Sequence, residues 1–140
     1  MLVTFLDADP QDTLYPFTAT RSAADIRIGI LTIRQKWDLI LQQIDWNVDK
    51  ELQVRSNIIP TKKYAVQINE HGDDDMKTIN HPWDIFLLND WALRKDFELL
   101  TQGRISQPIS TTNKTISPEN IFIEEGAKVE HSMLNASAGP

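Results

Sequence analysis

The chain has 140 residues, 41% hydrophobic and 24% charged, which is the composition of one ordinary globular domain or two small ones. Its 14 basic and 20 acidic residues leave a net charge of -6, and no cluster of basic residues offers a surface for nucleic acid. The absence of cysteine excludes disulfides and thiolate chemistry. No signal-peptide pattern is found, nor an apolar stretch of the roughly 20 residues that a membrane helix needs. We therefore expect a soluble, cytoplasmic protein that binds neither nucleic acid nor membranes.

The amino-terminal segment predicts a buried strand followed by a loop. Residues 1–6 are a short apolar run, which is typical of a strand. Residues 7–22 are polar and acidic, and Pro10 and Pro16 interrupt regular hydrogen bonding there. The loop is therefore expected to be irregular from the end of the strand to Ser22.

Two helical regions are predicted further along the chain. Apolar residues recur at helical spacing over residues 29–43, which indicates an amphipathic helix. Residues 52–68 predict extended or mixed structure with a short helix opening at Thr61. A second helical region is expected to begin at Pro82 and to end before Gly103, a residue suited to a helix C-cap. Three tryptophans on these helical faces are expected in the core or in an interface: Trp37, Trp83 and Trp91.

The carboxyl-terminal segment allows two interpretations. After an irregular stretch over residues 104–118, Ile123 and Val129 open two units of six residues, a spacing typical of a parallel β-helix. An ordinary β-hairpin is the alternative. Under the first interpretation the chain stops inside a third repeat, so the residues after Glu124 are expected to be poorly ordered or held by a second copy.

Three segments together resemble the sugar nucleotidyltransferases. The loop FLDADPQDTLYPFTATRSAAD can be laid without a gap on their signature, which is roughly LAAGxGTRLxPLTxxRPKxL. The segment HPWDIFLLND resembles the motif that links the nucleotidyltransferase domain to a left-handed β-helix in chimeric sugar nucleotidyltransferase/acyltransferases. The tail resembles the first coils of that β-helix. The chain is most similar to a bacterial group related to the bifunctional N-acetylglucosamine-1-phosphate uridylyltransferase.

The resemblance implies an α/β fold in two parts. Residues 1–103 would form a degenerate sugar-nucleotidyltransferase-like module, and residues 104–140 a connector and the start of a left-handed parallel β-helix. The implied reactions are nucleotidyl transfer to a sugar 1-phosphate, or acyl transfer from a CoA thioester to an amino sugar. The implied ligands are a sugar phosphate or nucleotide sugar, and self-association is expected.

The signature loop departs from the family pattern at the residues that carry the chemistry. Its two phosphate-binding glycines are replaced by Asp9 and Gln11, and its final Pro-Lys pair by Ser22 and Ala23. Backbone N–H groups at glycines and a lysine are what stabilise a triphosphate during transfer. We therefore assign no catalytic residue and predict that these 140 residues alone do not catalyse nucleotidyl transfer. Aspartates replace neutral positions in the loop. No cofactor is assigned, and the resemblance implies only that Mg²⁺ could lie between carboxylate and phosphate.

The resemblance implies three substrate-binding residues, Thr18, Arg21 and Asp25. Arg21 is the cation retained from the family loop and could hold a phosphate; the alternatives are an ion pair with Asp25 or a solvated side chain. The run from Asp73 to Asp75 could bind a hard cation, or could simply be a solvated loop. The three histidines have no zinc-binding spacing, so no metal ligand is assigned.

A second hypothesis belongs to a different class of function. The chain could be a non-catalytic binding or oligomerisation module in which the altered loop serves packing, subunit contacts or binding of a sugar nucleotide.

Overall fold

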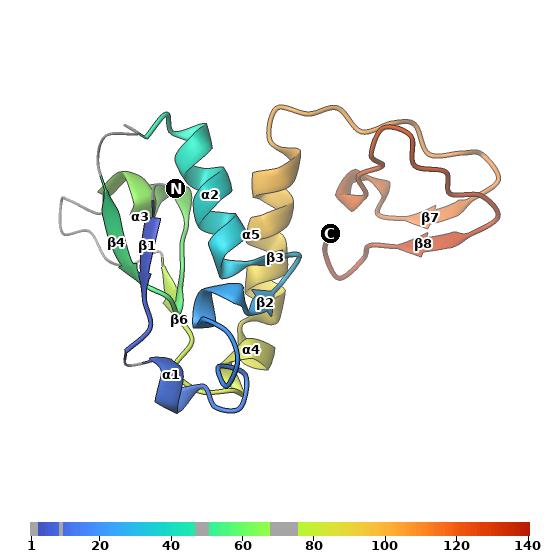
Figure 1. The fold of residues 1–140 in the computed structure, drawn as a ribbon. Coiled ribbons are helices and arrows are strands. Elements are labelled where there is room, and N and C mark those ends of the chain that lie inside the picture. Colours follow the sequence, from blue (N-terminus) through green and yellow to red (C-terminus); the bar gives the residue numbers. More distant parts are fainter. Residues whose placement is uncertain (1–2, 9, 47–50, 68–75) are drawn as a thin grey trace. The chain divides into compact units, whose positions relative to one another are not determined.

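The computed structural model (Figure 1) describes the chain except residues 1–2, 9, 47–50 and 68–75. Its contacts divide the chain into two units, Met1–Asp96 and Phe97–Pro140. Short strands and helices alternate along the chain, so the predicted mixed α/β class is confirmed.

The first unit is organised around a parallel strand pair. Strand β1 (Val3–Leu6) pairs with β4 (Leu52–Arg55), and the register runs from Val3 opposite Leu52 to Leu6 opposite Arg55. One further bond, from the Ser56 N–H to the Leu6 carbonyl at 3.0 Å, continues the ladder beyond β4. The predicted strand ending at Leu6 is confirmed. Parallel strands need a crossover connection, and residues 7–51 supply it.

The crossover contains more regular structure than its sequence suggests. Its elements are α1 (Pro10–Thr13), the 3-10 turn η1 (Ala23–Asp25), β2 (Arg27–Ile28), β3 (Leu31–Thr32) and α2 (Ile33–Gln43). The prediction of an irregular loop is wrong over the four residues of α1. Pro10 is the first helical residue there, and a missing N–H costs nothing at that position. The other described residues of this segment, 7–8 and 14–22, form turns and bends or have no regular structure.

Helix α2 begins four residues later than predicted. Thr32 caps it: its hydroxyl accepts from the Gln35 N–H, and the Gln35 side chain accepts from the Thr32 N–H in return. Gly29 has a φ of +72°, and the residues beside it form the β2–β3 hairpin, so they cannot be helical. The buried stripe of α2 consists of Ile33, Trp37, Ile40 and Leu41, as the helical spacing indicated.

The remaining elements of the first unit follow β4 directly. They are β5 (Ile58–Ile59), α3 (Lys62–Gln67), β6 (Lys77–Thr78), α4 (Asp84–Leu87) and α5 (Asn89–Thr101), the last of which continues into the second unit. The expected extended segment, the short helix after Thr61 and the second helical region are confirmed. Gly103, at a φ of +72°, lies just past α5 as expected of a C-cap. Trp37 is fully buried, but Trp83 is 58% exposed and is not a core residue.

A buried ion pair joins α2 to α5. Lys36 and Asp96 are each 2% exposed, and the Lys36 ammonium contacts both carboxylate oxygens of Asp96. The same carboxylate accepts the N–H groups of Ile30 at 2.8 Å and Leu31 at 3.0 Å. A Cβ on Gly29 would lie 2.7 Å from that carboxylate, so this turn requires glycine both for its φ and for its close approach to α5.

The second unit contains one parallel strand pair, and no repeated coils of a β-helix are evident in it. Strand β7 (Lys114–Ile116) pairs with β8 (Met133–Asn135), and the 3-10 turn η2 (Pro118–Asn120) follows β7. The predicted six-residue units are wrong as strands, because neither Ile123 nor Val129 lies in one. The hairpin interpretation is also wrong, since a hairpin pairs its strands antiparallel. Residues 104–118, predicted to be irregular, contain β7.

No helix within the described ranges combines the length and the apolar character needed to cross a membrane.

Candidate functional site

The residues after β1 surround a cavity of about 260 Å³. It is lined by Asp7, Gln11 and residues 18–22. In open α/β sheets, ligands bind outside the carboxyl ends of the parallel strands, and this cavity lies directly after the carboxyl end of β1. The cavity is therefore the candidate site of the first unit.

Asp7 holds the far end of the loop against β1. Its Oδ1 accepts from the Ser22 hydroxyl at 2.8 Å and from the Ala23 N–H at 3.2 Å. The Ser22 hydroxyl in turn accepts from the Ala24 N–H at 3.1 Å and caps η1. Asp7 thus acts as a loop anchor within the cavity wall.

Arg21 brings a positive charge to the cavity. Its side chain is exposed and lines the cavity, and no ion pair involves it among the described residues. The backbone N–H groups of Thr20, Arg21 and Ser22 also have no hydrogen-bond acceptor among the described residues. A guanidinium beside unpaired N–H groups is suited to an anion such as phosphate. The Asp7 carboxylate in the same lining limits how much negative charge the cavity favours.

The other two predicted binding residues have structural partners. Thr18 is 2% exposed, and its hydroxyl donates to the Gln11 carbonyl at 2.6 Å, which closes the loop on itself. Asp25 pairs with Arg34 through two bonds of 2.7 and 3.3 Å. The alternative of an Arg21–Asp25 ion pair is therefore wrong. Thr18 and Arg21 line the cavity together, whereas Asp25 does not.

Arg34 was not singled out from the sequence. Its guanidinium lies 4.6 Å from the centre of the Phe5 ring on β1. The hydrogen bond to Asp25 raises the pKa of Arg34, against the opposing effect of partial burial. This ion pair fixes the end of η1 to the start of α2. Its partners are nine residues apart and belong to different elements, so no local pattern could reveal it.

Ser56 and Asn57, which follow β4, were also missed. Ser56 is fully buried and Asn57 is 5% exposed. The Asn57 amide donates to the Ile79 carbonyl at 2.8 Å. The Ser56 hydroxyl oxygen and the Asn57 Oδ1 have no hydrogen-bond partner among the described residues. Two neighbouring buried polar atoms without partners are unusual and require an explanation.

The segment before α4 is held by Asp84. Its Oδ2 accepts the N–H groups of Asn80 at 2.8 Å and His81 at 2.9 Å. Desolvation raises the pKa of Asp84, but these hydrogen bonds outweigh it, so the pKa lies below its ordinary value. The His81 ring stacks on Trp83, with the ring centres 4.5 Å apart.

Asn89 completes this motif, because its Oδ1 accepts the Gly29 N–H at 2.9 Å. In HPWDIFLLND, Asp84 is therefore explained by the hydrogen bonds that hold the segment before α4, and Asn89 by the attachment of the β2–β3 turn to α5.

The described residues contain no group of three or more His, Cys, Asp or Glu side chains that could hold a metal ion. Asp9 and the run Asp73–Asp75 lie outside the described residues. The carboxylate that does face the cavity, Asp7, uses one oxygen for the loop. The described side chains therefore form no cluster that could hold a metal ion by itself.

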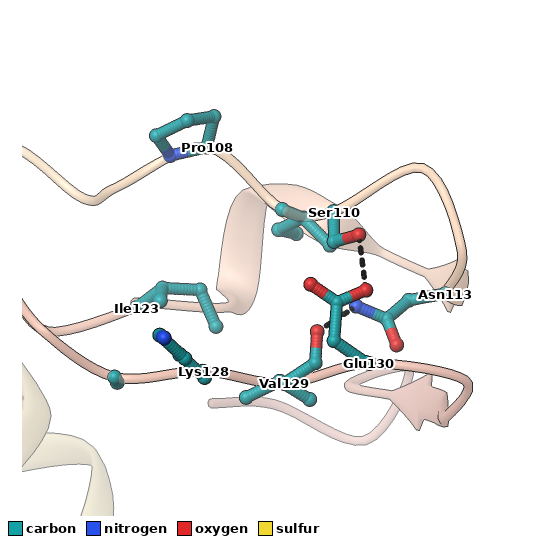
Figure 2. A pocket seen from close by; sticks show the side chains of 9 residues that line it. Pro108, Ser110, Asn113, Ile123, Lys128, Val129 and Glu130 are labelled. Carbon is teal, nitrogen blue, oxygen red and sulfur yellow. Dashed lines mark hydrogen bonds between the residues drawn. The ribbon is translucent and has the colours of Figure 1, made fainter.

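A smaller hollow of about 90 Å³ lies in the second unit (Figure 2). Glu130 accepts the hydroxyl groups of Ser110, at 2.6 Å, and Thr112, and these bonds lower the pKa of Glu130. The Asn113 amide donates to the Val129 carbonyl at 2.6 Å. Because Ser110, Asn113 and Glu130 are bonded within the unit and the hollow is smaller, it is a weaker candidate than the cavity after β1.

Comparison with protein families gives one match. The family model described as sugar nucleotidyl transferase matches residues 2–70 and 47–105. Neither the curated proteins nor the solved structures contain a match to the chain.

Proposed function

Because the chain belongs to the sugar nucleotidyl transferase family, we propose that its first unit binds a sugar phosphate or nucleotide sugar in the cavity after β1. Arg21 and the N–H groups of residues 20–22 hold the phosphate. The observation that carries this proposal is the combination of an unpaired guanidinium and unpaired N–H groups in the lining of one cavity, within the described part of the chain. Thr18 supports the binding loop through its bond to Gln11, and Asp25 supports it through Arg34.

We further propose that this chain by itself does not transfer a nucleotidyl group. Transfer requires several cationic or N–H groups around the phosphates as charge develops. Among the described residues, Arg21 is the one cation that lines the cavity, and Asp7 adds a carboxylate to the same lining. The described side chains also form no cluster that could hold a metal ion by itself.

The second unit supports a finer assignment to the chimeric nucleotidyltransferase/acyltransferases. Strands β7 and β8 pair in parallel, and the Ser132 N–H donates to the Asn113 side chain across 19 residues of chain. Parallel pairing of segments at this separation is what one turn of a β-helix requires. We propose that this unit begins a left-handed β-helix. An acyl transfer from a CoA thioester to an amino sugar would belong to further coils, which these residues do not form.

A non-catalytic binding or oligomerisation module is the second candidate function. The exposure of large apolar side chains on and beside α4 favours it: Trp83 is 58%, Phe86 77% and Leu87 74% exposed. Clustered exposed apolar residues commonly mark interaction surfaces. In this function, the chain would bind a ligand at the cavity and self-associate through the exposed side chains of Trp83, Phe86 and Leu87, and it would catalyse no reaction.

Calorimetric titration with glucose 1-phosphate and UDP-glucose tests the proposed phosphate site. Arg21→Gln should weaken binding by about tenfold, as expected for the loss of a charge-assisted hydrogen bond. Lys63→Gln is the matched control, because it removes the same charge from an exposed position on α3. Equal losses of affinity for Arg21→Gln and Lys63→Gln would show that binding depends only on the net charge of the chain. Binding of neither ligand by the unaltered chain would refute the proposed function.

A further inference from the structure

The two unpartnered polar atoms belong to residues that follow β4, the strand that pairs with β1 beside the candidate site. Ser56 follows β4 directly, and its N–H bonds to the carbonyl of Leu6, the residue before Asp7. Asp7 lines the cavity and anchors its loop. Ser56 and Asn57 thus lie at the carboxyl ends of both parallel strands, where α/β sheets bind their ligands.

The orientation of the Asn57 amide is determined by its neighbours. Its Nδ2 donates to the Ile79 carbonyl at 2.8 Å, and the Ile79 N–H donates to the Asn57 carbonyl at 3.0 Å. A flipped amide would place an oxygen against the Ile79 carbonyl. The free atom is therefore the acceptor Oδ1, and the Ser56 hydroxyl is the free group beside it in the chain.

These two groups select the chemistry of their partner. An amide oxygen can only accept, and a hydroxyl can donate or accept. A phosphate at neutral pH offers mainly acceptors, so it cannot satisfy Asn57 Oδ1. The partner must carry an O–H or N–H group and be neutral, since desolvating a charge here would be costly. This requirement is complementary to that of Arg21, which favours an anion.

We propose that Ser56 and Asn57 form a second subsite, which binds a neutral hydrogen-bond donor of the phosphate ligand. That donor is either a sugar hydroxyl or the amide N–H of a nucleobase. The inference rests on the proposed function, because the phosphate at Arg21 supplies the anchor. Both side chains are covered in the free protein, so the donor reaches them by displacing neighbouring atoms as the ligand binds.

Ser56→Ala provides the sharpest test, because the Ser56 hydroxyl has no partner in the described residues. Its removal should leave the melting temperature of the free protein unchanged or raised. It should raise the Kd of a ligand carrying the bound donor by about 2- to 10-fold, and leave the Kd of inorganic phosphate unchanged. Ser137→Ala, an exposed position in the second unit, is the matched control.

Three ligands identify the source of the donor. If Ser56→Ala weakens the binding of glucose 1-phosphate alone, the donor is a sugar hydroxyl. If Ser56→Ala weakens the binding of UMP but not of ribose 5-phosphate, the donor is the nucleobase. As a second measurement, the NMR signal of the Asn57 side-chain amide should move on addition of the selected ligand but not of inorganic phosphate.

The outcomes separate this inference from the function on which it rests. If the unaltered chain binds the ligands and Ser56→Ala changes no Kd, the subsite is refuted and the phosphate site stands. If Ser56→Ala lowers the melting temperature by several degrees with every Kd unchanged, the hydroxyl is structural, and the subsite is again refuted. If the unaltered chain binds none of the ligands, both proposals fall.

Discussion

Replacing Lys36 by methionine should destabilise the first unit strongly. The Asp96 carboxylate contacts the Lys36 ammonium through both oxygens and accepts two N–H groups from the β2–β3 turn. Without the lysine, a charge that is 2% exposed loses its counter-ion. Breaking one side of such a pair costs about 3–5 kcal/mol, against a total stability of roughly 5–15 kcal/mol for an ordinary domain. Burial lowers the pKa of Lys36 despite the opposing carboxylate, so desolvation of this ammonium is already costly.

Urea denaturation followed by far-ultraviolet circular dichroism measures this loss. Asp96→Asn should also destabilise, because it leaves the ammonium unpaired. The double variant, Lys36→Met with Asp96→Asn, should lose clearly less free energy of unfolding than the two single variants lose together. No buried charge remains in it, and the new amide oxygen at position 96 can still accept an N–H group. Lys63→Met, on the exposed surface of α3, is the control. A loss below about 1 kcal/mol for Lys36→Met, or additive losses in the double variant, would refute the reasoning.

Three further predictions concern the β2–β3 turn, the segment before α4 and the loop after β1. Gly29→Ala should lower the urea midpoint, because its φ of +72° alone costs about 1–2 kcal/mol and its Cβ would lie 2.7 Å from Asp96; an unchanged midpoint would contradict this. The pKa of Asp84 is below its ordinary value, so its stabilisation is complete above that value and is lost as pH falls through the folded-state pKa. The difference in melting temperature between the unaltered chain and Asp84→Asn should therefore stay constant above about pH 5 and narrow as the pH falls below it. With UTP and glucose 1-phosphate, the chain should release no pyrophosphate above background.

The local elements could be read from the sequence because their signals are local. The pattern of apolar residues is enough to predict the strand that ends at Leu6 and the buried stripe of α2. The conformational freedom of glycine is enough to predict the helix end before Gly103. The family could be recognised from the order of several such blocks, and its model matches residues 2–70 and 47–105. Arg21 could be chosen because it remains where the family loop carries a cation, although its binding role is still a prediction.

The partners of the polar residues were decided by the tertiary structure. Asp25 lies four residues from Arg21 in sequence but pairs with Arg34, because the chain turns into α2 and brings the second guanidinium to it. Lys36 and Asp96 are 60 residues apart, and each alone reads as an ordinary charged residue of an amphipathic helix. Hydrogen bonds and ion pairs act over a few ångströms, so which ones form depends on how strands and helices pack and not on spacing along the chain.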